Sequence, residues 1–375
     1  MSSTATSPQS TLVNQRLLTR QDDLAISLID TDSMSAPLQE GEVRLKLERF
    51  ALTTNNITYA AFGDSIGYWQ FFPVRNEGWG HMPVWGIARV AASRHPAVSE
   101  GQRFFGYYPM ADYLKVEATR VSERGFRDKT DYRQPLPSAY NYYTRLDAPS
   151  AETTNRENYR MLLRPLFLTS YMLADYLQEA DFFGAEQVVI SSASSKTAYG
   201  TAFCLASHPR LQLIGLTSSG NQSFVENLNL YQQTLSYKDI EQLDNQKSTL
   251  YIDFSGNDQL RANLHQHLGA NLQHDCYAGS AANPDFLDES RQQEVNAHFF
   301  FAALHIKKRN QELGAAVVSQ RLDAMQEYFI DRASDPSNPW LILETHTGLA
   351  AASQVVTSLC RNAADPKLGH VVIMP

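Results

Sequence analysis

Cysteine is scarce in this sequence: Cys204, Cys276 and Cys360 are the only three among 375 residues. They lie far apart, and no Cys-x-x-Cys or Cys–His spacing accompanies them. Disulfide frameworks and zinc sites both need closely grouped sulfur or imidazole ligands. The pattern therefore excludes a disulfide-stapled fold and predicts buried thiols with no bound metal ion.

Basic residues are outnumbered by acidic ones. Lys and Arg total 32 against 40 Asp and Glu, which gives a formal net charge of −8. Proteins that bind nucleic acids usually present a basic face, so the charge argues against a nucleic-acid partner. The basic cluster at 305–309 is too short to change this and is typical of the solvated end of a helix.

Long apolar runs are also missing, and none approaches the roughly 18 residues that a membrane span needs. The first 15 residues are rich in Ser and Thr and lack the basic start and apolar core of a signal peptide. We expect residues 1–18 to form a disordered tail on a cytoplasmic protein that does not associate with membranes. The composition, 43% hydrophobic and 19% charged, is that of a globular chain long enough for two domains.

The glycines of a dinucleotide fingerprint are absent where they would be most informative. In Gln187–Thr201, an apolar β-branched run ends in small hydroxyl residues, and a helical pattern follows. Strand, small-residue turn and helix together bring backbone N–H groups up to a phosphate. Lys196-Thr197 resembles the end of a P-loop, but the glycine spacing of that motif is missing, which disfavours a nucleoside triphosphatase. A serine-rich turn that binds nothing remains the alternative.

The N-terminal part of the chain shows short strands separated by Gly and Pro turns. An alternating pattern over 43–48 predicts a half-buried strand, and it runs into Thr53-Thr54-Asn55-Asn56, where we expect regular structure to end. An aromatic-rich segment at 62–85 follows and is explained either by packing or by the wall of a substrate pocket. Residues 20–145 are therefore predicted to form a small barrel or a partly open sheet.

Strands and helices alternate from Gln187 onward. Strands are predicted at 187–190, 211–217, 249–254 and 272–277, with helices between them. This spacing is typical of a parallel sheet with crossover helices, so the fold class is α/β.

Three segments in this order resemble a known superfamily: Gly41–Leu47 with Ala51–Asn56, Val98–Gly106, and Pro366–Val372. The layout is similar to the medium-chain dehydrogenase/reductases, in their zinc-free quinone- and enoyl-reductase-like branch, and resembles a divergent subgroup of unknown function. The resemblance implies a GroES-like β-rich catalytic domain and an inserted Rossmann-type doubly wound parallel sheet. Expected boundaries are 19–160 and 310–375 for the first domain and 161–309 for the second.

The resemblance also bears on metal and assembly. The family's zinc ligands are missing at the positions expected for alcohol dehydrogenases, which excludes that activity. Reductases of this kind are often dimers, so a homodimer is possible.

The cofactor expected on this fold is NADP (NADPH). The second strand of the parallel sheet ends in Leu216–Asn221 without the acid that would bind the ribose 2′-OH of NAD. A tyrosine supports the 2′-phosphate in the reductases that this chain resembles, and Tyr237 has a matching context beside Lys238. The cofactor-binding candidates are Asn55, Ser192, Ala193, Ser194, Ser195, Lys196, Thr197, Thr217, Ser218, Ser219, Asn221, Tyr237, Phe254, Ser255, Gly256, Tyr277 and Gly279.

Catalysis without zinc needs a neutral donor for the oxyanion formed by hydride transfer. The resemblance implies a tyrosine, so Tyr59 and Tyr68 are candidates, with Asn56 or Asn55 binding the carbonyl oxygen or the nicotinamide ribose. Each tyrosine singly is also explained by packing. An aromatic, uncharged pocket suits an apolar carbonyl or activated C=C substrate: an enone, a quinone or an enoyl thioester. A catalytically silent NADP(H)-binding sensor or assembly subunit, and a domain that acts on carrier-bound substrates, remain alternatives.

Overall fold

The computed structural model describes residues 12–34, 36–65, 67–278, 297–361 and 365–375. The chain divides into two compact units. The first comprises residues 1–150, 345–363 and 370–375, and the second comprises 151–344 and 364–369. The second unit therefore begins near the expected residue 161 but extends well beyond the expected residue 309.

The first unit is built on a barrel. Its eight-stranded sheet has the order β16-β17-β3-β5-β6-β9-β8-β7, and β7 also pairs with β3, which closes the sheet on itself. The strands that close the barrel are β3 Glu42–Leu52, β5 Val84–Ser93, β6 Arg103–Tyr108, β7 Tyr113–Ser122, β8 Gly125–Asp128 and β9 Tyr142–Leu146. On β3, Val43, Leu45 and Leu47 point into the core, as their alternation with charged residues predicts.

A smaller sheet of order β2-β1-β4 belongs to the same unit, with strands β1 Val13–Arg20, β2 Ser27–Ser33 and β4 Trp79–Gly80. This corrects the expected tail of residues 1–18, because β1 begins at Val13. Leu17 and Leu18 are fully buried, so this part of the supposed tail contributes to the hydrophobic core.

Two α-helices complete the β-rich unit, α1 Thr54–Ala61 and α9 Gly348–Cys360. We expected regular structure to end at Thr53–Asn56. Instead, these residues begin α1. The Thr53 side chain accepts from the Asn55 N–H, and the Asn56 side chain accepts from the Thr53 N–H at 2.8 Å, which makes a capping box. The polar side chains that suggested a loop are thus the groups that begin the helix.

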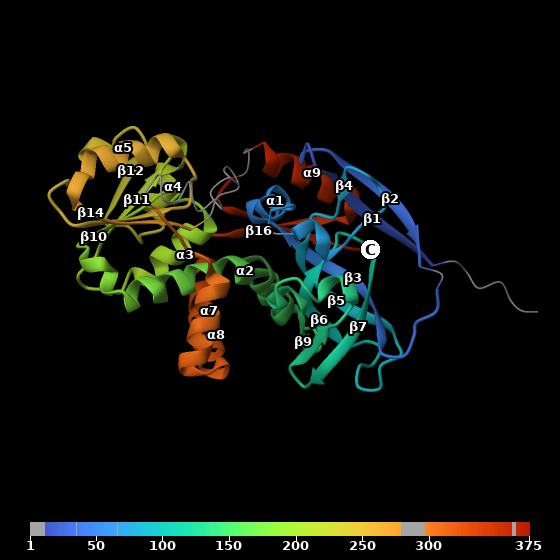
Figure 1. Cartoon of the computed structure of the whole chain (residues 1–375). Coiled ribbons are helices and arrows are strands. Elements are labelled where there is room, and N and C mark those ends of the chain that lie inside the picture. The colour runs from blue at the N-terminus through green and yellow to red at the C-terminus, as the bar shows by residue number, and fades with distance from the viewer. Residues whose placement is uncertain (1–11, 35, 66, 279–296, 362–364) are drawn as a thin grey trace, which may run out of the picture. The chain divides into compact units, whose positions relative to one another are not determined.

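The second unit holds a six-stranded parallel sheet of order β12-β11-β10-β13-β14-β15 (Figure 1). In chain order this reads 3-2-1-4-5-6, the strand order of a Rossmann-type doubly wound sheet, and it confirms the predicted fold class. The strands are β10 Gln187–Ile190, β11 Gln212–Thr217, β12 Gln233–Ser236, β13 Thr249–Asp253, β14 Leu272–Tyr277 and β15 His298–Phe299. The order reverses between β10 and β13, which is where such sheets bind ligands.

The second unit also contains helices. They are α2 Ala151–Glu179, α3 Lys196–Leu205, α4 Gln222–Asn227, α5 Asp258–Leu268, α7 Ala302–Leu313 and α8 Ala315–Ala333. Of these, α7 and α8 pack against α2. The long helix α2 continues through Pro165. Its Arg156 and Arg160 form ion pairs with Glu327 of α8, and Arg164 pairs with Asp323. These contacts to α2 explain why α8 belongs to this unit rather than to the barrel.

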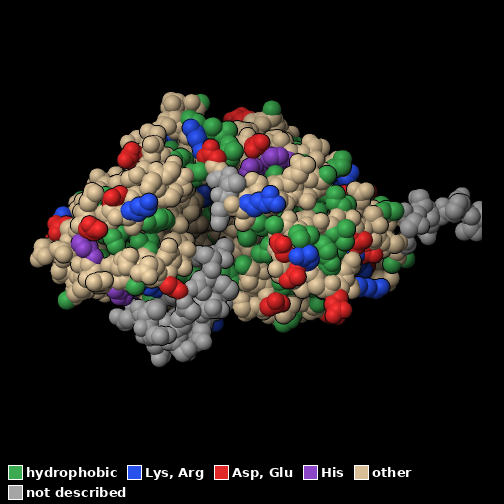
Figure 2. All heavy atoms as spheres, turned by 90° about the horizontal axis from the view of Figure 1, so that it is seen from above, with side chains coloured by type: hydrophobic (Ala, Val, Ile, Leu, Met, Phe, Trp, Pro, Cys, Tyr) green, Lys and Arg blue, Asp and Glu red, His purple; other side chains and the backbone are tan. Residues whose placement is uncertain are grey.

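The surface carries both signs of charge. Acidic and basic side chains are interspersed over the face shown in Figure 2. Within the described part of the chain, no helix is both long enough and apolar enough to cross a membrane.

Candidate functional site

The turn after β10 has the backbone of a glycine turn without the glycine. Ser192 has φ +48°, in the left-handed region that non-glycine residues rarely adopt. Its N–H donates to the Tyr237 hydroxyl at 3.1 Å, and the next N–H, of Ala193, donates to the Leu216 carbonyl at 3.0 Å. Ala193 is fully buried. The chain therefore makes a tight strand-to-helix turn that the Tyr237 side chain and the backbone of β11 hold in place.

Hydroxyl groups line the turn toward β11. The Ser194 hydroxyl accepts from Asn221 Nδ2 at 3.2 Å and from the Thr217 hydroxyl at 3.4 Å. Ser195 is the N-cap of α3, and its side chain accepts from the Ala198 N–H at 3.3 Å. Four of the predicted cofactor residues thus gather at the N-terminus of a ten-residue helix, where N–H groups and the helix dipole favour an anion.

A buried serine joins the ends of β10 and β13. The Ser191 hydroxyl donates to Asp253 Oδ1 at 2.7 Å and accepts from the backbone N–H groups of Phe254 and Ser255. Asp253 also pairs with Arg261 at 2.6 Å. This network places the loop of Phe254, Ser255 and Gly256 beside the serine turn, at the point where the strand order reverses.

The positions of Ser191 and Asp253 in the network were not predicted from sequence. Ser191 follows β10 and Asp253 ends β13, but nothing in the sequence shows that the two strands are neighbours. Burial and the attraction of Arg261 act in opposite directions on Asp253, and the net effect with its hydrogen bonds is a lowered pKa. The carboxylate is therefore an acceptor for the surrounding N–H and O–H groups.

Lys196 is the cation nearest the turn in sequence, and its ammonium donates to the Pro366 carbonyl at 3.1 Å. Burial lowers the pKa of this ammonium to about 8, and the Asp365 carboxylate opposes that effect. Lys196 lies at the start of α3, where a phosphate anion would favour the protonated, positively charged form of the side chain.

The end of β11 carries no acid, as the sequence shows. Thr217 is buried, whereas Ser218 and Ser219 are exposed and Asn221 is partly exposed. Tyr237 follows β12 and reaches back to Ser192, so it does lie at this edge of the sheet. Thr197 is in the first turn of α3, and its carbonyl accepts from the Ser170 hydroxyl at 2.8 Å.

The last two predicted cofactor residues are Tyr277 and Gly279. Tyr277 is buried at the end of β14, opposite Asp253 in the sheet. Gly279 lies outside the described residues.

Tyr59 and Tyr68 come together in the β-rich unit, with ring centroids 4.8 Å apart. The Tyr59 hydroxyl accepts from Trp85 Nε1 at 3.0 Å, and the Tyr68 hydroxyl lies 2.9 Å from the Tyr140 hydroxyl. Tyr107 packs edge-on against Tyr59 at 5.5 Å. We call Tyr59, Tyr68, Tyr107 and Tyr140 the tyrosine cluster.

Tyr59, Tyr68 and Tyr107 are buried and Tyr140 is partly buried, and all four stay protonated. Burial raises the pKa of Tyr59 and of Tyr68 above the ordinary value of 10.0, and the Tyr68 ring adds to the effect on Tyr59. Burial likewise raises the pKa of Tyr107 and Tyr140. Neutral O–H groups in an apolar setting are able to donate to a developing oxyanion without a metal ion.

Tyr107 and Tyr140 were not predicted as site residues. Tyr107 falls in a strand that reads as ordinary core, and Tyr140 falls in a polar stretch that reads as a loop. The Tyr107 hydroxyl is buried and has no hydrogen-bond partner among the described residues. This buried hydroxyl without a partner is the structural observation that identifies Tyr107 as a candidate site residue.

Asn56 is occupied by its own fold. Its Oδ1 accepts from the Thr53 N–H, and its Nδ2 donates to the Pro83 carbonyl at 2.9 Å. Asn56 therefore positions the start of α1. Asn55 is partly exposed, and its side chain hydrogen-bonds to Tyr59 and opposes the rise in the Tyr59 pKa.

Two histidines, His81 and His95, have structural surroundings. His81 is buried, and burial together with the charge of Arg16 lowers its pKa to about 3, which keeps it neutral. His95 Nδ1 accepts from the Ala97 N–H in a turn.

The fold is shared with solved structures of enoyl reductases and of an NADPH:quinone reductase. CurA from Vibrio vulnificus, solved in complex with NADPH, matches with a TM-score of 0.56 at 12% identity, covering 96% of this chain and 99% of that chain. The JamJ enoyl reductase matches with a TM-score of 0.56 at 12% identity, over 98% and 100%. The CurK enoyl reductase matches with a TM-score of 0.53 at 13% identity, over 96% and 99%.

A comparison with models of protein families assigns the chain to one family. The model described as "Protein of unknown function (DUF2855)" matches residues 50–365. The chain belongs to this family. No curated protein matches it.

Proposed function

We propose that the protein is an NADPH-dependent oxidoreductase that reduces an apolar carbonyl or an activated C=C without a catalytic metal ion. One observation carries the proposal: a strained, glycine-like turn at Ser192 stands at the switch point of a Rossmann-type sheet. A non-glycine residue in that conformation costs free energy, roughly 1–2 kcal/mol, and such strain persists where the surrounding structure demands it.

The residues present fit a dinucleotide. The N-terminus of α3 and the hydroxyls of Ser194 and Ser195 offer donors to a pyrophosphate. The second strand ends in Thr217 and Ser218 with no carboxylate to repel a 2′-phosphate. The solved structures of CurA and of TarJ from S. aureus were each determined in complex with NADPH, and they support this choice at the level of the fold.

The tyrosine cluster supports reduction of an oxygen-bearing or conjugated group. NADPH supplies the hydride when it is bound. Tyr59 and Tyr68 then serve as neutral donors to the oxyanion, or as the source of its proton, because their raised pKa keeps the O–H intact. The aromatic rings around these hydroxyls suit an enone, a quinone or an enoyl thioester rather than a sugar phosphate.

A second candidate is a catalytically silent NADP(H)-binding sensor or assembly subunit. The observation in its favour is that hydroxyls of the tyrosine cluster already bond to side chains of their own unit, Tyr68 with Tyr140 and Tyr59 with Trp85. In this function the cluster is packing, and the dinucleotide site alone is used.

Two measurements separate these functions. Fluorescence titration of the full-length protein with NADPH and NADH tests the cofactor, and we expect NADPH to bind more tightly. If neither binds at about 1 mM, the dinucleotide proposal fails. Oxidation of NADPH with a panel of enones, quinones and enoyl thioesters then tests catalysis. Binding with no turnover on any of these, in wild type and in Tyr59→Phe and Tyr68→Phe alike, favours the silent protein.

A further inference from the structure

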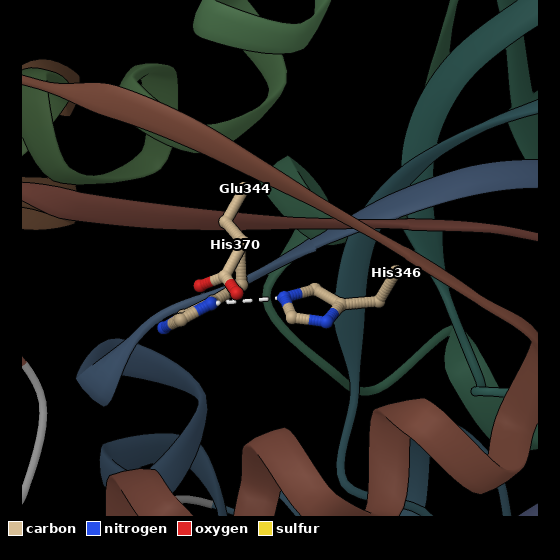
Figure 3. Close-up of side chains that lie close together, drawn as sticks. All are labelled: Glu344, His346 and His370. Carbon is tan, nitrogen blue, oxygen red and sulfur yellow. Dashed lines mark hydrogen bonds between the residues drawn. The ribbon is translucent and has the colours of Figure 1, made fainter.

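Two histidines meet on neighbouring strands at the edge of the eight-stranded sheet. His346 is on β16 Ile342–Thr347, and His370 is on β17 Leu368–Ile373, the next strand of the sheet. His346 Nε2 lies 3.1 Å from His370 Nδ1, with the ring centroids 5.2 Å apart. These nitrogens face each other, as Figure 3 shows.

Glu344 adds a carboxylate to the pair. It precedes His346 by two residues on the same strand, and side chains at that spacing share one face of a strand. One ligand atom from each of Glu344, His346 and His370 lies within 4.8 Å of the others. The three side chains converge in Figure 3 and are exposed or partly exposed, so an ion from solvent can reach them.

The spacing of the nitrogens matches that of two ligands on one ion. Metal–imidazole bonds of about 2.0–2.1 Å separate two tetrahedral nitrogen ligands by about 3.3 Å and two ligands at a right angle by about 2.9 Å. The observed 3.1 Å lies between these values. An ion can therefore replace the hydrogen bond at this separation, with each ring turned so that its nitrogen points at the ion.

We propose that Glu344, His346 and His370 form a binding site for a divalent first-row transition-metal ion such as Zn²⁺. Imidazole nitrogens suit zinc, nickel, copper and iron, whereas Mg²⁺ and Ca²⁺ prefer all-oxygen sites. Three protein donors leave a position for water in a tetrahedral ion. The site was not predicted from sequence, because His370 is far along the chain from Glu344 and His346 and only strand pairing joins them.

The site has a consequence for the fold that is separate from the proposed reductase function. A bound ion links β16, the terminal strand of its sheet, to the neighbouring strand β17. It therefore stabilises the folded chain in proportion to its affinity, since the unfolded chain holds the ligands apart. Charged and polar residues also occur on edge strands simply to prevent aggregation, and in that case no ion binds.

The test is calorimetric titration of the chelator-treated full-length protein with ZnCl₂, together with the visible spectrum after CoCl₂ is added. We expect one ion per chain, a rise in melting temperature, and a Co²⁺ spectrum of a nitrogen-ligated site. His346→Ala and His370→Ala should each weaken Zn²⁺ binding by at least 10–100-fold, about the loss seen when even a supporting residue of a metal site is removed. Glu344→Gln should weaken binding while preserving the size of the side chain.

His298→Ala is the matched control. His298 also stands near another histidine, His274, with ring centroids 5.7 Å apart, and it is not part of the proposed site. Zn²⁺ affinity should be unchanged in this variant. The proposal is overturned if wild type binds Zn²⁺ no more tightly than about 1 mM. It is equally overturned if His346→Ala and Glu344→Gln, shown to be folded by circular dichroism, bind the ion as wild type does.

Discussion

The Ser192 backbone N–H donates a 3.1 Å hydrogen bond to the hydroxyl oxygen of Tyr237. A residue that follows the third strand of the Rossmann-type sheet therefore holds the turn that follows the first strand. The bond places a phenol at the edge where a 2′-phosphate would lie, and it fixes a turn whose φ at Ser192 is unfavourable. Predictions about cofactor selectivity and about stability follow from this pair.

Tyr237→Phe should weaken NADPH binding by about tenfold, which corresponds to the roughly 1.4 kcal/mol that one hydrogen bond contributes. NADH binding should change less, since it has no 2′-phosphate. Fluorescence titration of both cofactors measures the ratio. Tyr231→Phe is the control, because the Tyr231 hydroxyl donates to the Ala193 carbonyl of the same turn but at a longer 3.3 Å. An equal loss for NADPH and NADH would contradict the assignment of Tyr237 to the 2′-phosphate.

Ser192→Gly should raise the free energy of unfolding by about 1 kcal/mol, because glycine adopts a positive φ without the clash of a Cβ atom. Urea denaturation measures the change. Ser194→Gly serves as the comparison, since Ser194 has no positive φ and its hydroxyl accepts two hydrogen bonds, so this substitution should destabilise. If Ser192→Gly proves destabilising, the turn is not strained in the way that its backbone angle indicates.

NADPH affinity should fall as pH rises through about 8, the lowered pKa of Lys196, because the amine then loses the charge that attracts a phosphate. Near that pH, cofactor binding should also take up a proton, which calorimetry in buffers of different ionisation enthalpy detects. Lys196→Met should bind weakly with no such pH dependence, and Lys196→Arg should keep the affinity at high pH. Proton uptake that persists in Lys196→Met would assign the titration to another group.

The same lysine makes a prediction about stability. An unfolded chain holds the Lys196 proton up to the ordinary pKa of 10.5, whereas the folded chain loses it near 8. The unfolded state therefore binds more protons between these values, so this group makes the free energy of unfolding rise with pH in that window. Urea denaturation of wild type and Lys196→Met across this range should show the rise in wild type alone.

Tyr59→Phe or Tyr68→Phe should lower kcat by about 10²–10⁴-fold for the tyrosine that donates the proton, the usual contribution of a general acid. The KM for NADPH should stay the same. Because burial raises both pKa values above 10.0, ionisation of these tyrosines should not reduce the rate up to that pH. Tyr108→Phe is the control, since Tyr108 is buried in the same unit with its hydroxyl on the Phe104 carbonyl, outside the tyrosine cluster. Unchanged kcat in both variants would remove the cluster from the mechanism.

Local patterns were sufficient for much of the fold. Alternation along residues 43–48 predicted β3, and the apolar run before Ser191 predicted β10, because strand burial depends on side chains only two residues apart. Local patterns failed where the same kind of polar side chain is compatible with two different local structures. Thr53–Asn56 predict an irregular segment but begin α1, because side chains that cap a helix are also those that favour a turn.

The sequence alone determined the α/β class, the position of the serine turn and the absence of an acid after the second strand, since each depends on neighbouring residues. Only the tertiary structure decided that Ser191 bonds to Asp253, that Tyr107 and Tyr140 join Tyr59 and Tyr68, and that His370 meets His346. These contacts join residues far apart in the chain. Strand order and barrel closure bring them together, and those are properties of how distant segments pack rather than of any local pattern.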